Sequence, residues 1–262
     1  MFELIDVSYS YNDMTALKSI NLLIEKGETV SFLGANGCGK STLFKLLCGL
    51  VVPDTGTYRF DGSIVNKKTL SDAGFSKRLH QRVGFVFQNS DTQLFCADVF
   101  EEVAFGSRQM GLEQKDIEER VSDTLALLGL HGFESRNPYH LSGGEKRKVA
   151  LAAVLAMNPD ALVLDEPMSG LDPRTMRWLA DFLVRLNNIG KTILVSTHNL
   201  DLVGEISKRA VLFDENHTLA ADMPSSDILN DIDLLKQINL VDQNFHKHSH
   251  GGHNSFHTHD TP

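Results

Sequence analysis

The pattern of apolar and polar residues predicts short buried strands that alternate with amphipathic helices. Apolar runs bounded by glycine or polar residues are typical of strands, and such runs occupy residues 17–24, 29–33, 57–60, 83–87, 161–164, 192–196 and 210–213. Apolar residues recur at helical spacing in residues 113–128 and at Met176, Leu179, Ala180, Leu183 and Leu186. Strands separated by helices favour a parallel sheet with crossover connections, and therefore an α/β fold.

Polar residues and glycines at the ends of these segments predict where they begin and stop. Lys26-Gly27-Glu28 supplies a turn, so the N-terminal strands are predicted to form antiparallel β-hairpins. Asp98 can cap a helix that starts at Val99. Another helix is expected over residues 41–47, with its end near Gly49.

The distribution of these segments predicts three parts of the chain. Residues 1–224 form one α/β unit, and a helical insertion within it covers about 89–159. Residues 225–243 are predicted to be a helical extension. Residues 244–262 are polar and rich in histidine and glycine, so we expect a flexible, disordered tail.

Composition narrows the setting in which the chain acts. The 262 residues include 34 acidic and 25 basic side chains, and the net charge of −9 argues against a nucleic-acid partner. No apolar run approaches the roughly 18 residues of a membrane span, and no basic leader precedes an apolar stretch at the N-terminus. Three cysteines without metal-ligand spacing favour a reduced, cytosolic compartment. We therefore expect any membrane attachment to go through a protein partner.

The strongest chemical signal is a glycine-rich loop between a predicted strand and a predicted helix. We call it the phosphate loop; it reads Gly-Ala-Asn-Gly-Cys-Gly-Lys-Ser over residues 34–41. Glycines permit a tight turn whose backbone N–H groups surround phosphate oxygens at the positive end of a helix. Lys40 would add a charge at the terminal phosphates, and the Ser41 hydroxyl can bind Mg²⁺. The alternative, a glycine-rich turn without a ligand, is disfavoured by the strand before the loop and the helix after it.

Polar residues that end two other predicted strands add hydrolytic chemistry. Asp165 and Glu166 follow four apolar residues, at the strand edge where parallel sheets bind ligands. Asp165 would hold Mg²⁺, and Glu166 would position or deprotonate an attacking water. His198 ends another strand and could donate a hydrogen bond to the γ-phosphate. The alternative is an acidic loop and a histidine with structural roles only.

These motifs, together with Leu141-Ser142-Gly143-Gly144-Glu145, resemble the ATP-binding cassette (ABC) family of transport ATPases. We call residues 141–145 the signature segment. The resemblance covers residues 2–223 and implies a P-loop NTPase core with an N-terminal antiparallel β subdomain and a helical insertion that carries the signature segment. It implies ATP and Mg²⁺ as ligands, catalytic roles for Lys40, Gln88, Glu166 and His198, and Mg²⁺ contacts for Ser41, Gln88 and Asp165. The implied nucleotide contacts are Tyr11, Gly34, Asn36, Gly37, Cys38, Gly39, Lys40, Ser41, Thr42, Ser142, Gly143, Gly144, Glu145 and Asp172.

The resemblance also implies a second subunit. In this family the signature segment closes over the ATP held by another cassette, and Asp172 belongs to a loop that crosses the dimer interface. Residues 142–144 would open a helix and present free N–H groups to an anion. We therefore expect a dimer of ATPase subunits, and a homodimer is compatible with one chain that carries every motif. The basic run at 146–148 is expected to be a solvated helix face, with support of phosphate as the lesser alternative.

Two residues depart from the usual family pattern. Glu145 stands where most members have glutamine, and we expect activity to be kept because many members carry glutamate there. Cys38 occupies a position often filled by serine. A thiol at a helix N-terminus beside Lys40 is expected to ionise readily, so thiol reagents should inhibit the ATPase and MgATP should protect it.

The local sequence resembles one branch of the family, the energy-coupling-factor (ECF) importers, and within it the cobalt and nickel uptake ATPases. The similar segments are residues 87–95, 101–106 and 149–157. The resemblance implies a transmembrane coupling protein and a membrane protein that captures the substrate, with this chain at the cytoplasmic face. The alternatives are an ECF ATPase for a vitamin or another small substrate, an ABC ATPase of DNA repair or translation, and a metal-responsive regulatory subunit.

The C-terminal tail bears on the cargo. Neutral imidazole binds Ni²⁺, Cu²⁺, Zn²⁺ and Co²⁺ well. Six of the eleven histidines lie there: His246, His248, His250, His253, His257 and His259. They are possible transition-metal ligands that would buffer or sense metal, and the alternative is a polar tail without a role in transport.

Overall fold

The computed structural model describes residues 1–241, and it describes the backbone alone for residues 245–250 and 253–258. A six-stranded sheet in the order β10-β9-β3-β8-β7-β6 forms its centre, and β3, β8, β7, β6 and β9 run parallel. The strands are β3 (Thr29–Leu33), β6 (Val83–Val86), β7 (Ala161–Leu164), β8 (Thr192–Ser196), β9 (Arg209–Phe213) and β10 (Leu219–Pro224). Every residue of β3, β7 and β8 is buried, as expected for apolar runs covered on both faces of a parallel sheet.

A second, four-stranded antiparallel sheet has the order β2-β1-β4-β5. Its strands are β1 (Phe2–Tyr11), β2 (Met14–Ile24), β4 (Thr55–Phe60) and β5 (Ser63–Ile64). The prediction that the 26–28 turn joins two hairpin strands is wrong, because β2 pairs with β1 whereas β3 pairs with β8 and β9. The reason lies in burial: β2 alternates between exposed and buried residues, but β3 is buried throughout and belongs inside the parallel sheet.

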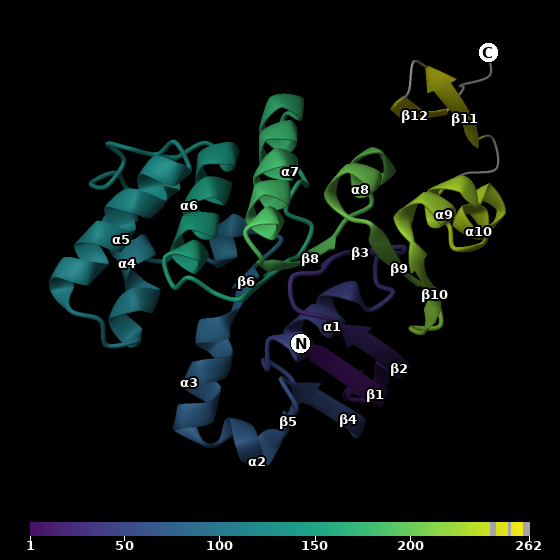
Figure 1. The fold of residues 1–262 in the computed structure, drawn as a ribbon, viewed down its shortest axis with the longest axis horizontal. Coiled ribbons are helices and arrows are strands. Elements are labelled where there is room, and N and C mark those ends of the chain that lie inside the picture. Colours follow the sequence, from purple (N-terminus) through teal and green to yellow (C-terminus); the bar gives the residue numbers. More distant parts are fainter. Residues whose placement is uncertain (242–244, 251–252, 259–262) are drawn as a thin grey trace.

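Helices surround the central sheet and form a separate group at one side, which we call the helical lobe (α4–α6). The helices are α1 (Lys40–Leu47), α2 (Lys67–Leu70), α3 (Ala73–Arg82), α4 (Val99–Gln109), α5 (Gln114–Leu127), α6 (Gly143–Leu155), α7 (Pro173–Asn188), α8 (Leu200–Ile206), α9 (Ser225–Asn230) and α10 (Ile232–Gln237). Short 3₁₀ turns occupy Ser90–Thr92 and Pro138–His140. The lobe lies away from β1, β2 and β4 (Figure 1). As predicted, Asp98 caps α4 by accepting a hydrogen bond from the Glu101 N–H.

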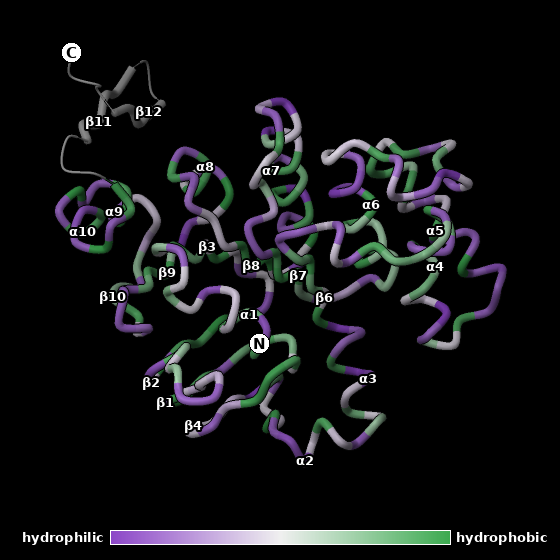
Figure 2. Tube along the Cα trace, turned by 180° about the vertical axis from the view of Figure 1, so that it is seen from behind, coloured by the Kyte–Doolittle hydropathy of each residue, from purple (hydrophilic) through white to green (hydrophobic). Residues whose placement is uncertain are grey.

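Three hydrophobic clusters hold these layers together. One joins the helical lobe to β7, β8 and α7, a second fills the space between the two sheets and α1, and a third lies under α9 and α10. The central strands are correspondingly hydrophobic along the trace, whereas the outer loops are hydrophilic (Figure 2). In the part of the chain that the structure describes, no helix is both long and apolar enough to span a bilayer.

The C-terminal region differs in part from the expectation. Helices α9 and α10 lie within the segment predicted to be helical. Where composition predicts a disordered tail, β11 (Phe245–His250) and β12 (His253–Thr258) pair antiparallel. Gly251 and Gly252 separate these two strands in the sequence. The side chains of the six tail histidines lie outside the described residues, so their role as metal ligands stays a prediction.

Candidate functional site

The phosphate loop connects β3 to α1 in a conformation that requires glycine. Gly34, Gly37 and Gly39 have φ angles of 147°, 84° and 118°. Residues other than glycine rarely adopt such positive φ angles. A Cβ on Gly39 would lie 2.5 Å from the Ala16 carbonyl oxygen, whereas a Cβ on Gly37 would meet nothing within 4 Å. The loop is therefore packed against its own chain on one side and open on the other.

Lys40 is the charged group of this loop. The residue is 6% exposed, and its Nζ donates to the carbonyl oxygens of Gly34 at 2.6 Å and Ala35 at 3.0 Å. A cavity of about 300 Å³ opens beside it. The residues that line this phosphate cavity are Asn36, Gly37, Gly39, Lys40, Ser41, Thr42, Gln88 and Glu166. The geometry offers backbone N–H groups and an ammonium to an anionic ligand.

Asp165 and Glu166 follow β7 directly and are both buried, at 5% and 7% exposure. Ser196, at the end of the neighbouring β8, holds both: its hydroxyl donates to Asp165 Oδ1 and accepts from the Glu166 N–H, each at 2.7 Å. Sequence reasoning did not identify Ser196. The signal for it was present, since Ser196 is the polar residue that ends a buried strand beside His198.

The side chains of Glu166 and His198 face each other at the edge of the sheet. His198 is 64% exposed on its side chain, and its Nδ1 lies 2.9 Å from Glu166 Oε2. Glu166 itself has a φ of 44°, in the left-handed region that is uncommon for a residue other than glycine. A strained backbone at a buried carboxylate on a cavity is typical of functional positions.

Gln88 lies just beyond β6 and is exposed. It lines the phosphate cavity and also a second cavity of about 330 Å³. The second cavity is lined by Gln88, Asn89, Ser90, Asp91, Gly143, Lys146, Arg147, Ser169, Gly170 and Leu171. One residue of the signature segment and the loop before Asp172 therefore share this second cavity with Gln88.

The signature segment begins α6 with a capping box. Ser142 Oγ accepts from the Glu145 N–H, and Glu145 Oε2 accepts from the Ser142 hydroxyl at 2.7 Å and the Ser142 N–H at 2.8 Å. These hydrogen bonds hold the pKa of Glu145 below its usual value. Asp172 caps α7 in a similar way, accepting from the Arg174 and Thr175 N–H groups, and the hydroxyl and N–H of Thr175 lower its pKa.

The structure does not bring every predicted nucleotide contact to the phosphate cavity. None of Ser142, Gly143, Gly144, Glu145 and Asp172 is among the described residues that line it. Tyr11 lies at the end of β1, is 38% exposed and packs edge-on against Tyr9. Within one chain, the phosphate loop and the residues Asp165 and Glu166 form one half of the site. The signature segment and Asp172 lie outside the phosphate cavity.

Two expectations about side chains are wrong. Cys38 is 3% exposed, and burial raises the pKa of its thiol in spite of the nearby Lys40, so ready ionisation is not expected. The 146–148 run is not a solvated helix face. Lys146 pairs with Asp91, Lys148 lies over the Trp178 ring, and Arg147 is 6% exposed.

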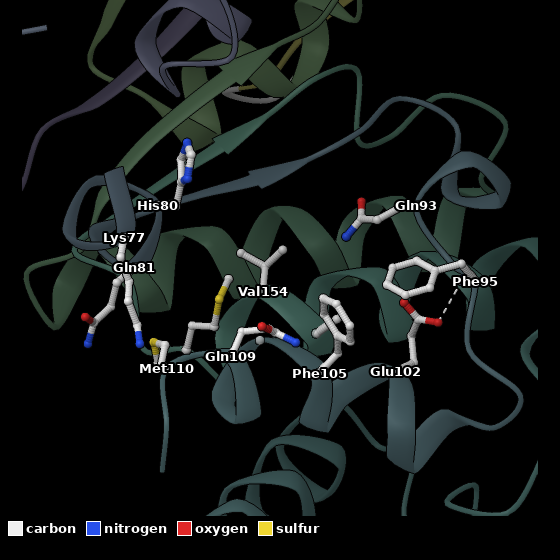
Figure 3. Close-up of a pocket in the computed structure, with 13 residues that line it drawn as sticks. Lys77, His80, Gln81, Gln93, Phe95, Glu102, Phe105, Gln109, Met110 and Val154 are labelled. Atoms are coloured by element: carbon white, nitrogen blue, oxygen red, sulfur yellow. Dashed lines mark hydrogen bonds between the residues drawn. The ribbon is translucent and has the colours of Figure 1, made fainter. Parts of the chain in front are cut away.

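A third cavity, which we call the apolar groove, lies between the helical lobe and α3. It encloses about 480 Å³, and Lys77, His80, Gln93, Phe95, Phe105, Val154 and Met157 are among its lining residues. Phe95 and Phe105 lie near each other along it, with their ring centroids 5.0 Å apart (Figure 3). Phe95 is 60% exposed, an unusual state for a large aromatic ring. Within residues 1–241, no cluster of three or more metal-binding side chains occurs.

Comparisons with known proteins agree with this geometry. The family described as ABC transporter matches residues 17–169. The nickel import ATP-binding protein LarO of Lactiplantibacillus plantarum is 43% identical over 87% of this chain and 95% of its own length. The energy-coupling factor transporter ATP-binding protein EcfA of Methanothermobacter thermautotrophicus is 42% identical over 92% of this chain and 76% of its own. Among solved structures, cbiO1 of Clostridium perfringens, part of the ABC transporter complex cbiONQ, has a TM-score of 0.78 and 33% identity over 91% of this chain and 94% of that one.

Proposed function

The chain belongs to the ABC transporter family, as an ATP-hydrolysing subunit of the energy-coupling-factor type, and we propose that it powers uptake of a transition-metal cation, nickel or cobalt, across the cytoplasmic membrane. The observation that supports a metal as the cargo is the similarity to LarO. The name of LarO states nickel import, and this chain matches it over nearly its whole length. We keep the division into an ATPase domain (1–224), a helical extension (225–243) and a histidine-rich tail (244–262) as part of this proposal.

The phosphate cavity supports ATP binding through the residues that surround it. Residues Gly34 to Thr42 would supply backbone N–H groups to the phosphates, and Lys40 would exchange its two carbonyl partners for phosphate oxygens. The Ser41 hydroxyl, the Gln88 amide oxygen and the Asp165 carboxylate are hard oxygen donors that suit Mg²⁺. When bound, Mg²⁺ neutralises charge on the β- and γ-phosphates.

Glu166 and His198 support hydrolysis. We assign to Glu166 the role of the base that accepts a proton from a water attacking the γ-phosphorus, so that ADP and phosphate leave. Ser196 would keep Asp165 and the Glu166 backbone at fixed positions through its two hydrogen bonds. His198, already 2.9 Å from the Glu166 carboxylate, would orient that carboxylate and donate to the γ-phosphate.

The signature half of the site supports a dimer. Ser142 and Gly143 are exposed at the start of α6 and lie outside the phosphate cavity of their own chain. We propose that they close over ATP bound by a second copy, with Asp172 at the interface and Glu145 holding the helix start. Tyr11 would stack on the adenine, which its exposed ring permits.

The apolar groove supports a membrane partner. Its exposed phenylalanines lie beside Gln93 and Glu102 (Figure 3), in the region where we expect a transmembrane coupling protein to dock. A separate membrane protein would capture the substrate, and this chain would stay at the cytoplasmic face. The similarity to cbiO1, which is part of a multi-subunit transporter complex, supports this arrangement.

A vitamin or another small molecule is the second candidate cargo. EcfA, whose name states energy coupling but no cargo, matches this chain nearly as well as LarO does, so the second candidate stands beside the first. The ATPase subunit does not need to contact the cargo, so the nucleotide site itself does not discriminate between the two.

The test is uptake by the chain reconstituted with its two membrane proteins. We expect MgATP-dependent accumulation of labelled Ni²⁺ or Co²⁺, and none when Glu166→Gln replaces the native chain. Accumulation of a vitamin without metal would favour the second candidate and overturn the metal proposal. Deleting residues 245–262 tests the tail separately: unchanged uptake at limiting metal would remove its role in transport.

A further inference from the structure

Helix α6 passes three functional regions in succession. Its first turn contains Gly143 to Glu145 of the signature segment, and near its last residue Ala153 and Val154 line the apolar groove. Between these ends, Arg147 projects toward the chain that leaves β6. The helix is therefore in contact with the partner-facing, Mg²⁺-facing and membrane-facing parts of the molecule.

Arg147 is a buried cation that no carboxylate within residues 1–241 balances. Its Nη1 donates to the Phe87 carbonyl oxygen at 2.7 Å, and its Nη2 donates to the Gln88 carbonyl oxygen at 2.6 Å. Within residues 1–241 its Nε has no hydrogen-bond partner, and no carboxylate forms an ion pair with the guanidinium. Burial lowers the pKa of this guanidinium, and among the described residues no neighbouring charge offsets that effect.

A buried guanidinium without a paired anion is not expected to stabilise the fold. Removing a guanidinium from water is costly, and attraction to an anion or a full set of hydrogen bonds normally offsets the cost. Here the guanidinium donates to two carbonyl groups. Both carbonyl groups belong to exposed residues, which water could solvate instead. What the rigid guanidinium fork does provide is a fixed distance between α6 and two consecutive peptide groups.

Gln93 makes a second connection between the same two segments. Its Oε1 accepts from the Phe87 N–H at 3.1 Å, and its Nε2 donates to the Ala150 carbonyl oxygen of α6 at 2.9 Å. The peptide groups on both sides of Phe87 are therefore held to α6. The Gln88 side chain stays uninvolved in these bonds and lines both the phosphate cavity and the second cavity.

We propose that Arg147 is a positioning residue that fastens the Gln88 backbone to α6, so that Gln88 and the signature segment move as one body. A displacement of α6, from either the partner subunit or the groove, then changes the position of the Gln88 amide at the Mg²⁺ of the same chain. This inference rests on the proposed roles of Gln88 and of the signature segment.

The test compares Arg147→Met with Arg108→Met in the reconstituted complex. Arg108 is a matched control because it lies in the same helical lobe but pairs with Glu101 on the surface. We expect Arg147→Met to raise the Mg²⁺ concentration for half-maximal ATP hydrolysis about tenfold, the effect of losing charged hydrogen bonds. Mg²⁺-free ATP binding and the melting temperature should match those of Arg108→Met. Arg147→Lys, which can reach one carbonyl, should fall between.

Gln88→Ala, alone and combined with Arg147→Met, distinguishes a failure of this inference from a failure of the proposed function. If Arg147 acts through Gln88, the double variant should have the Mg²⁺ requirement of Gln88→Ala alone. A normal requirement in Arg147→Met beside a raised one in Gln88→Ala would overturn the inference and leave the proposed function intact. A normal requirement in Gln88→Ala would overturn both. Equal losses of ATP binding and melting temperature in Arg147→Met would show a structural role only.

Discussion

The phosphate loop and the signature segment are both glycine-containing starts of helices, yet only the first is enclosed by its own chain. A Cβ on Gly39 would collide with the Ala16 carbonyl at 2.5 Å, but a Cβ on Gly143 would meet nothing within 4 Å. Gly143 also lacks the positive φ that would require glycine. The fold therefore explains the glycine at 39 and leaves the glycine at 143 unexplained.

The contrast between the two glycines indicates where the missing half of the site lies. A glycine that the fold does not need is consistent with close approach by another molecule. Lys40, Asp165 and Glu166 are buried and already have partners within the chain, whereas Ser142 and Gly143 are exposed. We interpret the first region as a preformed catalytic half-site and the second as the surface that completes the half-site of a second subunit.

The largest expected effect is on the preformed half. Glu166→Gln removes the proposed base but keeps the shape of the side chain, so turnover should fall about 10³-fold. ATP binding should remain, because the phosphate loop is untouched. Steady-state phosphate release and equilibrium binding of ATP measure the two quantities, and a variant that hydrolyses at the native rate would remove Glu166 from the mechanism.

The second prediction concerns Ser196, which links the two carboxylate residues. Ser196→Ala should lower turnover about tenfold and reduce the free energy of unfolding by about 1–3 kcal/mol, because buried groups lose their hydrogen bonds. Ser31→Ala is the matched control, since Ser31 is a buried serine on β3 that bonds Ser207 instead. Equal turnover in the two variants, at equal stability loss, would show that Ser196 has no special relation to the site.

The smallest effect is expected at the signature end. Glu145→Gln keeps the capping geometry but removes a negative charge at a helix start, which should cost about 0.5 kcal/mol at neutral pH. Because the folded-state pKa of Glu145 is lowered, its contribution is present above the unfolded-state pKa and is lost as pH falls through the folded-state value. Urea unfolding of both proteins should therefore differ at pH 7 and agree in strong acid; a constant difference would contradict this assignment.

Local signals predicted much of the fold. Asp98 caps α4 because a helix start depends on neighbours in sequence, and the phosphate loop is contiguous for the same reason. Predictions failed where distant segments decide. The sequence predicts a turn at residues 26–28 from neighbouring residues alone. The pairing of β3 with β8 depends on segments far apart in the sequence, so the turn does not predict it. Cys38 is beside Lys40 in sequence, yet its burial, which raises the thiol pKa, depends on the whole surrounding fold.

The positioning residues were harder to predict than the residues they position. Ser196 contacts Asp165 across 31 positions, and Arg147 contacts Phe87 across 60. A partial signal existed for Arg147, because helical spacing places it on the same face as the buried Leu151 and Val154. A cation on a buried helix face calls for acceptors, but only the structure identifies the Phe87 and Gln88 carbonyls.

If the signature segment completes a site on a second subunit, ATP should drive the chain to dimerise. In sedimentation experiments, Glu166→Gln should become a dimer with ATP and stay a monomer without it. Adding Gly143→Asp should abolish the dimer, since a carboxylate there repels phosphate, yet it should preserve the fold because an acid suits a helix start. A double variant that binds ATP and still forms the same dimer would show that the signature segment does not complete the second subunit's site.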